Sequence, residues 1–200
     1  MSTIFRIFRS HVWAKSPFRV FFSNCRKEPI PVSWKKPEFG WTKLNFDGSC
    51  KCETGKASIG GVLRDHNATF LLGYAQSIGK TSSTVAEFAA LQRGLELVLE
   101  NGYTDLWLEG DYKTLVEIIS QKRDVKCVEV QKHVSCINLI LPEFRNYHVT
   151  HVYRQGNRLA DKFAQIGHEL KWPQVWLVPP DEVMKIVNED ANGKVIRRLR

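Results

Sequence analysis

Four acidic residues stand at points from which a fold could bring their carboxylates together: Asp47, Glu87, Asp111 and Asp161. Asp47 ends a strand-like run that begins at Trp41, Asp111 follows another short strand pattern, and the other two lie in the first turns of helix patterns. Carboxylates crowded at one point repel each other strongly at low dielectric. A fold tolerates such crowding mainly where it binds divalent cations, and oxygen-only sites suit magnesium or manganese. Paired magnesium ions are one means of cleaving phosphodiesters.

Each of these acids also has an ordinary structural explanation. Asp47 precedes a glycine, and Asp-Gly is a common turn dipeptide. Glu87 completes a capping box that begins at Thr84, although it also borders the apolar stripe of its helix, which directs it toward the sheet. Asp111 could cap the helix that follows it, and Asp161 could be a solvated acid near a helix start. It is their combined order along the chain that favours a shared site.

The elements that must position the acids can be predicted from hydrophobic periodicity and from capping residues. In chain order the predicted elements are strands over 43–47, 57–64 and 69–78, a helix over 84–100, a strand over 104–109, helices over 112–120 and 128–141, a strand over 147–153 and a helix over 157–170. This βββαβααβα order predicts an α/β fold in which a mixed sheet is flanked by helices.

Composition divides the 200 residues into one domain with extensions at both ends. We expect a transit peptide over 1–30, a proline-marked linker over 31–40, a folded domain over 41–170 and a C-terminal extension over 171–200, parts of which could pack on the domain. No stretch approaches the roughly 18 apolar residues of a membrane span, so no membrane partner is expected.

The N-terminus has the composition of an organelle transit peptide, because residues 1–27 contain six basic residues and no acid. The run from Arg19 to Ser23 also resembles a mitochondrial processing site. We therefore expect a mitochondrial location, with plastid or nucleus and cytoplasm as alternatives. A basic arm that touches nucleic acid is a further interpretation of the same residues. This segment holds much of the net charge of +8, since residues 1–30 carry +5. The mildly basic remainder does not by itself argue for nucleic-acid binding.

The five cysteines do not predict a metal site or a disulfide framework. Their number is odd, and Cys50-x-Cys52 has no second pair at zinc-binding spacing. Reduced thiols in an intracellular compartment are the simpler interpretation.

Residues 41–168 resemble the type 1 ribonuclease H domain in its plant form, which stands alone or ends retrotransposon polyproteins. The matching stretches, in family order and spacing, are Phe46–Ser49, Gly60–His66, Ser82–Leu91, Leu108–Asp111 and His151–Asp161. The resemblance implies a ribonuclease H-like fold with a five-stranded mixed sheet flanked by helices. It also implies an endonuclease that hydrolyses the RNA strand of RNA–DNA hybrids with two magnesium ions, for which manganese could substitute.

The resemblance also implies roles for individual residues. Catalysis and metal binding fall to Asp47, Glu87, Asp111 and Asp161, and substrate binding to Ser82, Ser83, Arg154 and Asn157. The two serines could equally be plain helix caps. Arg154 lies near the position of a histidine loop in bacterial relatives, so we expect it to replace that histidine in part. Tyr112 stands where the family has a small serine after the third acid, so we expect bulk beside the acids.

Three functions are compatible with the sequence. The first is a monomeric, metal-dependent ribonuclease acting on RNA–DNA hybrids. The second is a catalytically weak or inert module, derived from a retroelement, that binds nucleic acid or protein. The third is a pseudogene-like product whose targeting-like N-terminus is accidental. The intact set of four acids favours the enzyme, because an inert relative has no need to keep mutually repelling carboxylates.

Overall fold

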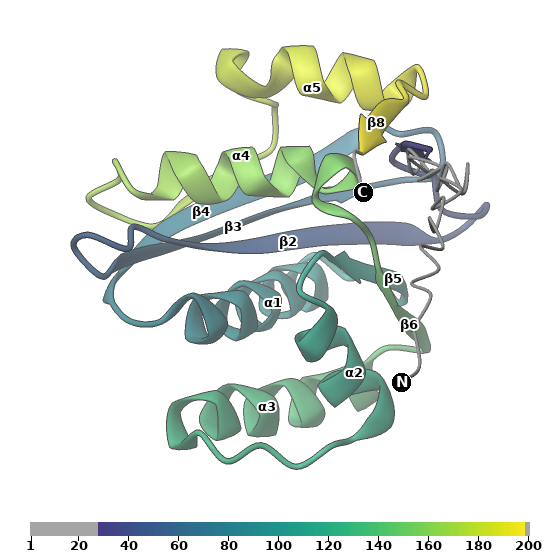
Figure 1. The fold of residues 1–200 in the computed structure, drawn as a ribbon. Coiled ribbons are helices and arrows are strands. Elements are labelled where there is room, and N and C mark those ends of the chain that lie inside the picture. Colours follow the sequence, from purple (N-terminus) through teal and green to yellow (C-terminus); the bar gives the residue numbers. More distant parts are fainter. Residues whose placement is uncertain (1–27, 199–200) are drawn as a thin grey trace, which may run out of the picture.

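The computed structural model describes residues 28–198, in which helices cover both faces of a central mixed sheet (Figure 1). Except for its last three residues, the expected transit peptide over 1–30 lies outside the described residues. The elements are β1 (Ile30–Val32), β2 (Thr42–Cys50), β3 (Lys56–Arg64), β4 (Phe70–Lys80), α1 (Ser83–Glu100), β5 (Asp105–Gly110), α2 (Lys113–Gln121), α3 (Val128–Ile140), η1 (Leu141–Glu143), β6 (Asn146–His151), η2 (Arg154–Gly156), α4 (Arg158–Gly167), β7 (Gln174–Trp176), α5 (Asp181–Ala191) and β8 (Ile196–Arg198).

The main sheet has the strand order β6-β5-β2-β3-β4-β7. Strands β2, β3 and β4 form the predicted antiparallel meander, whereas β5 runs parallel to β2 and β6 runs parallel to β5. The βββαβααβα order is thereby confirmed from β2 to α4. The sheet has six strands where five were expected, because β7 of the C-terminal extension pairs with the outer edge of β4.

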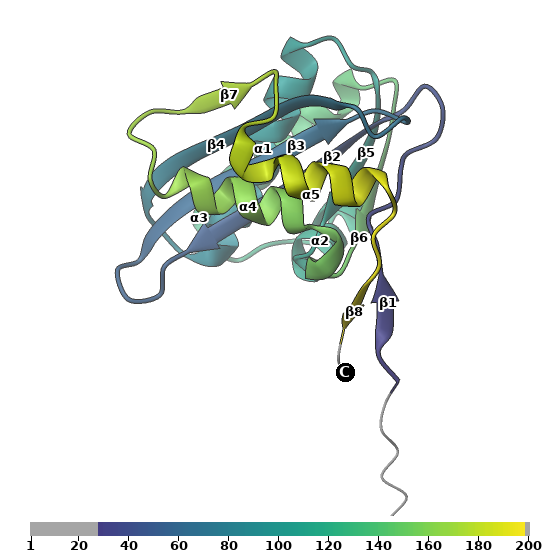
Figure 2. The same cartoon turned by 90° about the horizontal axis from the view of Figure 1, so that it is seen from above.

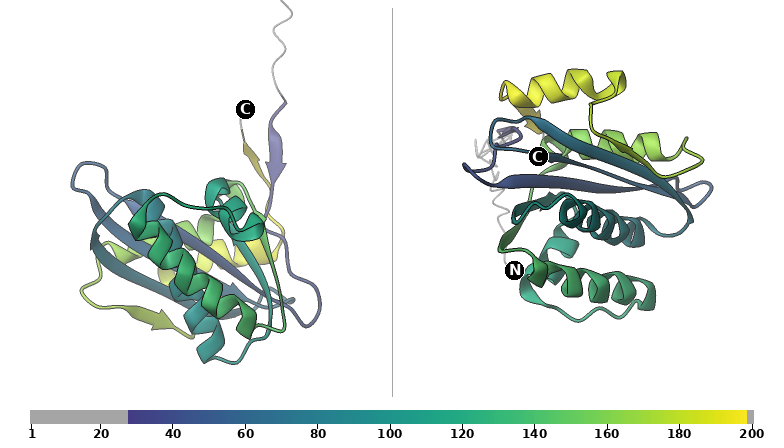
Figure 3. Two further views of the ribbon diagram at one scale, coloured as in Figure 1. Left: turned by 90° about the horizontal axis from the view of Figure 1, so that it is seen from below. Right: turned by 180° about the vertical axis from the view of Figure 1, so that it is seen from behind.

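Helices α1, α2 and α3 lie on one face of the sheet, and α4 and α5 lie on the other (Figures 1 and 3). Helix α1 begins where the Ser82 hydroxyl accepts a hydrogen bond from the Val85 N–H at 3.2 Å. It ends at Glu100, and its C-cap Asn101 is followed by Gly102 at a φ of +76°, a conformation that glycine adopts without strain. Among residues 28–198, no helix is both long and apolar enough to cross a membrane.

Two glycines let helix backbone reach the backbone of the sheet. A Cβ atom on Gly48 of β2 would lie 2.3 Å from backbone atoms of α1, and one on Gly60 of β3 would lie 2.1 Å from the Ala164 nitrogen of α4. Gly60 lies opposite Asp47 in the register of β2 and β3. These two approaches, from opposite faces, bring the N-terminal half of α1 and the middle of α4 against the strands β2 and β3, beside Asp47.

A buried polar network ties the segment before β2 to the sheet. The Trp34 indole N–H donates to the Asn45 side chain at 2.8 Å, and the Asn45 amide donates to a Glu109 oxygen at 3.1 Å. Lys43 pairs with Glu109 at 3.1 Å, and its ammonium lies 3.3 Å from the centroid of the Trp107 ring. Because each buried charge has a partner of opposite sign or an aromatic face, the network can persist without solvent.

The same network continues into the C-terminal extension. Arg64, which is 1% exposed, donates to Asn45 and pairs with Asp190 of α5 at 2.9 Å. Asp190 also pairs with Arg158 of α4 at 3.0 Å. Helix α5 is thus joined to both β3 and α4 through one buried carboxylate, and the extension is part of the folded unit.

The two ends of the described chain pair with each other. Strands β1 and β8 form an antiparallel ribbon of three residue pairs, Ile30–Val32 with Ile196–Arg198, that projects from the main sheet (Figure 2). Segments of three residues are too short for an alternating pattern to reveal them, so the sequence predicted neither strand.

We expect Asp190→Ala to lower the free energy of unfolding by about 3–5 kcal/mol, because it leaves the buried Arg64 without a carboxylate and removes one of the two carboxylate partners of Arg158. Asp181→Ala is the control: this acid lies exposed in the first turn of the same helix, and its removal should cost less than about 1 kcal/mol. Urea titration of the three proteins measures the difference. Similar losses in both variants would contradict the buried role of Asp190.

Candidate active site

Three carboxylates meet beside the parallel strands β2 and β5. One oxygen each from Asp47, Glu87 and Asp111 can be chosen so that all lie within 4.8 Å of one another. Asp161, at the start of α4, lines the same hollow, which has a volume of about 240 Å³. The structure therefore brings together all four acids that the sequence singled out.

Hydrogen bonds show whether Glu87 and Asp111 serve as helix-capping residues. The Glu87 carboxylate accepts the backbone N–H of Gly48 at 3.2 Å, so it reaches across to β2. The cap of α1 is Ser82, which excludes the capping box that was considered for Thr84 and Glu87. The side chain of Asp111 caps no helix either, because α2 begins after Tyr112 without a side-chain cap.

Burial and mutual repulsion hold protons on this cluster. Burial, followed by the charges of Glu87, Asp111 and Asp161, raises the pKa of Asp47 to about 10. The pKa of Glu87 rises to about 8, mainly through burial and the charge of Asp111, while the Gly48 N–H acts in the opposite direction. Burial also raises the pKa of Asp111. Carboxylates this close together, which offer only oxygen atoms as ligands, fit a hard divalent cation.

Asp161 differs from the other three acids because it has two partners within the fold. Its two carboxylate oxygens accept hydrogen bonds, one from the Arg154 guanidinium and one from the Gln165 amide, the latter at 2.7 Å. Arg154 also lines the acidic hollow. Gln165 was not predicted, although its spacing of four residues from Asp161 on one helix is a signal that could have revealed the contact.

The residues predicted to bind substrate fall in different places. Ser83 lines the acidic hollow, whereas Ser82 caps α1. Asn157 is only 1% exposed; its amide donates to the Phe46 carbonyl at 2.9 Å and its oxygen accepts from Asn45 at 3.2 Å. This placement differs from the expected substrate contact, because both ends of the side chain join the start of α4 to β2.

Tyr112 does not bring the bulk that was expected beside the acids. It is not among the residues that line the acidic hollow. Its hydroxyl lies 3.4 Å from the Thr84 hydroxyl of α1, and its ring packs against the core on that side of the sheet. The Tyr112 ring therefore does not fill the hollow beside the carboxylates.

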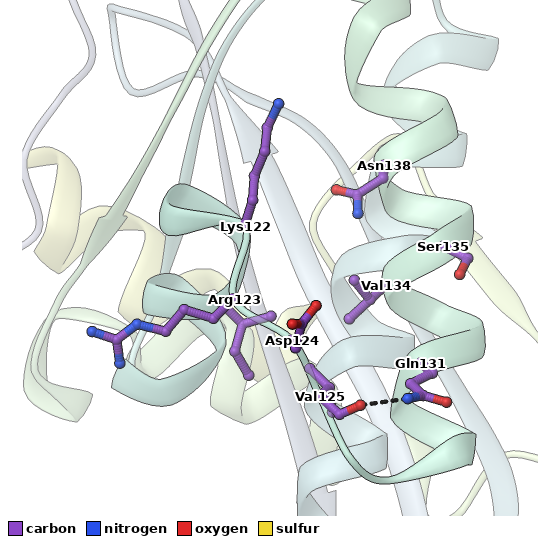
Figure 4. Close-up of a pocket in the computed structure, with 9 residues that line it drawn as sticks. Lys122, Arg123, Asp124, Val125, Gln131, Val134, Ser135 and Asn138 are labelled. Atoms are coloured by element: carbon purple, nitrogen blue, oxygen red, sulfur yellow. Dashed lines mark hydrogen bonds between the residues drawn. The ribbon is translucent and has the colours of Figure 1, made fainter.

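A different hollow, of about 380 Å³, lies between the end of α2 and α3 (Figure 4). The Gln131 amide crosses its rim to the Val125 carbonyl. Of the described residues that line it, Asp124 is the one acid. It lacks the group of converging carboxylates found beside β2, so the acidic hollow is the better candidate for chemistry.

The profile of a family described as "Reverse transcriptase-like" matches residues 45–167, more than half of the chain. The chain belongs to the reverse transcriptase-like family. Solved structures show that this domain has the ribonuclease H fold. Ribonuclease H1 from Halobacterium salinarum aligns with 64% of this chain and 98% of its own, with a TM-score of 0.61 and 25% identity. The ribonuclease H1 named LC11, solved in complex with an RNA/DNA hybrid, has a TM-score of 0.60 and 25% identity over 64% of this chain and 96% of its own.

Sequence relatives agree with this assignment. An Arabidopsis thaliana protein named "Putative ribonuclease H protein" is 30% identical over 94% of this chain, which spans 32% of that protein. Ribonuclease HI of Halobacterium salinarum is 27% identical over 60% of both chains. The chain thus spans about a third of the first relative and 60% of the second. The predicted ribonuclease H-like domain and fold are confirmed.

Without divalent cations, the ribonuclease H-like domain should lose stability as the pH rises from about 4.5 to about 8. The pKa values of Asp47 and Glu87 are raised by folding, so the native state binds more protons than the unfolded state and raising the pH favours unfolding. In chelator, Asp47→Asn should flatten this dependence and stabilise the domain at pH 8 by on the order of 2 kcal/mol.

Thermal unfolding at pH 5 and pH 8, followed by circular dichroism in chelator, measures this effect. Asp124→Asn, which replaces an exposed acid of the α2–α3 loop, is the matched control and should behave as the unmodified protein. The interpretation fails if the control and Asp47→Asn change the pH dependence equally.

Proposed function

We propose that this domain is a metal-dependent endonuclease that hydrolyses the RNA strand of RNA–DNA hybrids. The observation that carries the proposal is the convergence of Asp47, Glu87 and Asp111, which are held within 4.8 Å of one another despite their mutual repulsion. A solved neighbour of the same fold, a ribonuclease H1, was captured with an RNA/DNA hybrid, which supports this substrate. We further propose that the protein acts as a monomer.

The four acids would hold two Mg²⁺ ions, or Mn²⁺ in their place, and in phosphodiester cleavage such ions activate water and neutralise the charge on the leaving oxygen. The chain's own groups prepare the site. The Gly48 N–H fixes the direction of the Glu87 carboxylate. Asn157 anchors the start of α4, which sets the position of Asp161.

Two side chains at the hollow are suited to contact the substrate directly. Arg154 is 71% exposed at its side chain although it pairs with Asp161, so its remaining N–H groups can donate to a phosphate oxygen. Ser83 is exposed at the rim, and its hydroxyl can contact a 2′-hydroxyl, the group that distinguishes RNA from DNA. Tyr112 gives no support to an inert binding module, because it does not line the hollow.

We expect the full chain to cleave the RNA strand of a labelled hybrid with Mg²⁺ or Mn²⁺ and not in chelator. Asp111→Asn should slow cleavage by at least about a hundredfold while the hybrid remains bound, because the change removes a carboxylate ligand and keeps the side chain's shape. Asp124→Asn is the control and should cleave normally. Gel analysis of the labelled RNA strand gives the rates.

Two results would contradict the nuclease. One is cleavage that persists in Asp111→Asn or in chelator. The other is a folded protein that binds the hybrid but cleaves it with neither metal, which would instead support a binding module.

We also propose a mitochondrial destination, supported by the basic, acid-free composition of residues 1–27. Residues 1–40 fused to a fluorescent protein should co-localise with a mitochondrial marker. A matched fusion in which Arg6, Arg9 and Arg19 are replaced by glutamate should remain in the cytoplasm. Plastid fluorescence, or equal distribution of both fusions, would refute this destination.

A further inference from the structure

A second hollow, of about 490 Å³, adjoins the acidic one. Its lining residues are Asp111, Lys113, His151, Tyr153, Arg154, Gln155 and Arg198. Asp111 and Arg154 also line the acidic hollow, so the two depressions share a wall. A nucleic-acid strand whose phosphate lies at the carboxylates could therefore continue into the second hollow.

The second hollow is basic, in contrast to the first. Lys113, Arg154 and Arg198 line it together with His151, against the single carboxylate of Asp111. Arg154 is engaged by Asp161, and Lys113 lies 3.7 Å from a Glu117 oxygen. Arg198 forms no ion pair with any carboxylate of residues 28–198. Its guanidinium therefore carries a positive charge that no carboxylate of the described residues offsets, whereas Arg154 shares its charge with Asp161.

The position of Arg198 is fixed by two contacts. Its guanidinium carbon lies 4.0 Å from the centroid of the Tyr153 ring, which itself packs edge-on against His151. Its strand, β8, is held by pairing with β1. A guanidinium stacked on an aromatic face keeps its in-plane N–H groups free to donate to phosphate oxygens.

We propose that the hollow between Arg154 and Arg198 binds a backbone phosphate of the hybrid, adjacent to the bond that is cleaved. This inference rests on the proposed nuclease function and deepens it. Arg198 lies outside the family match over residues 45–167, so the C-terminal extension adds a substrate contact to the ribonuclease H-like domain. The neighbouring Arg197 is more exposed and, by the alternation of a strand, faces away from the hollow.

The test compares Arg198→Ala with its neighbour Arg197→Ala in the full chain. Both variants lose one positive charge from the same strand, so a difference between them reports on position. Fluorescence anisotropy of a labelled RNA–DNA hybrid in chelator measures binding without cleavage. Arg198→Ala should weaken binding by about fivefold to tenfold and reduce the slope of log K against log salt by about one. Arg197→Ala should leave the slope unchanged, and Arg198→Lys should retain it. Thermal unfolding of each variant shows whether the fold is kept.

Equal effects of the two alanine substitutions would overturn the phosphate site. The site would also be overturned if the unmodified protein and Arg198→Ala bound the hybrid equally well. This holds even if the unmodified protein binds inorganic phosphate at matched ionic strength. These results can be distinguished from those of the test of the proposed nuclease activity. Binding that depends on Arg198 without cleavage would refute the enzyme alone, and cleavage with no special role for Arg198 would refute this site alone.

Discussion

The acidic hollow depends on the absence of side chains at Gly48 and Gly60, where helix backbone meets the central strands. Any Cβ atom at these positions would overlap backbone atoms of α1 or α4, and backbone cannot move aside as the end of a flexible side chain can. Because α1 and α4 approach from opposite faces, each delivers one acid from near its N-terminus toward Asp47: Glu87 from α1 and Asp161 from α4. Strand β5, parallel to β2, delivers Asp111 from the sheet itself.

This geometry has an electrostatic cost that the surrounding groups only partly offset. The Gly48 N–H stabilises ionised Glu87, and Arg154 forms an ion pair with Asp161. Burial and three nearby carboxylates both oppose the ionisation of Asp47, so its pKa is raised more strongly than that of Glu87. The divalent cations proposed for this site would supply positive charge beside these carboxylates and so lessen their mutual repulsion.

A second polar cluster, buried on the sheet face that α4 and α5 cover, joins the family domain to both of its extensions. Asn45 accepts hydrogen bonds from Trp34 before the domain and from Arg64, which in turn holds Asp190 of α5. Through this cluster and the β1–β8 ribbon, the two ends of the described chain become part of one folded unit. That is how Arg198, distant in sequence from every motif, comes to lie beside Arg154.

The sequence by itself determined the order of elements from β2 to α4 and the identity of the four acids. Both follow from local signals: periodicity, capping residues, and acids placed at strand ends and helix starts. The tertiary structure decided the features that depend on residues distant in the sequence, namely the short strands and the burial of individual polar side chains. Strands β1, β7 and β8 have three residues each and exist only through pairing. Asn157 is withdrawn from the surface by Asn45, 112 positions away, and Tyr112 turns to Thr84, 28 positions away. Local propensity is set by near neighbours, whereas the burial of a polar side chain and the pairing of a short strand are set by contacts that arise only when the chain is folded.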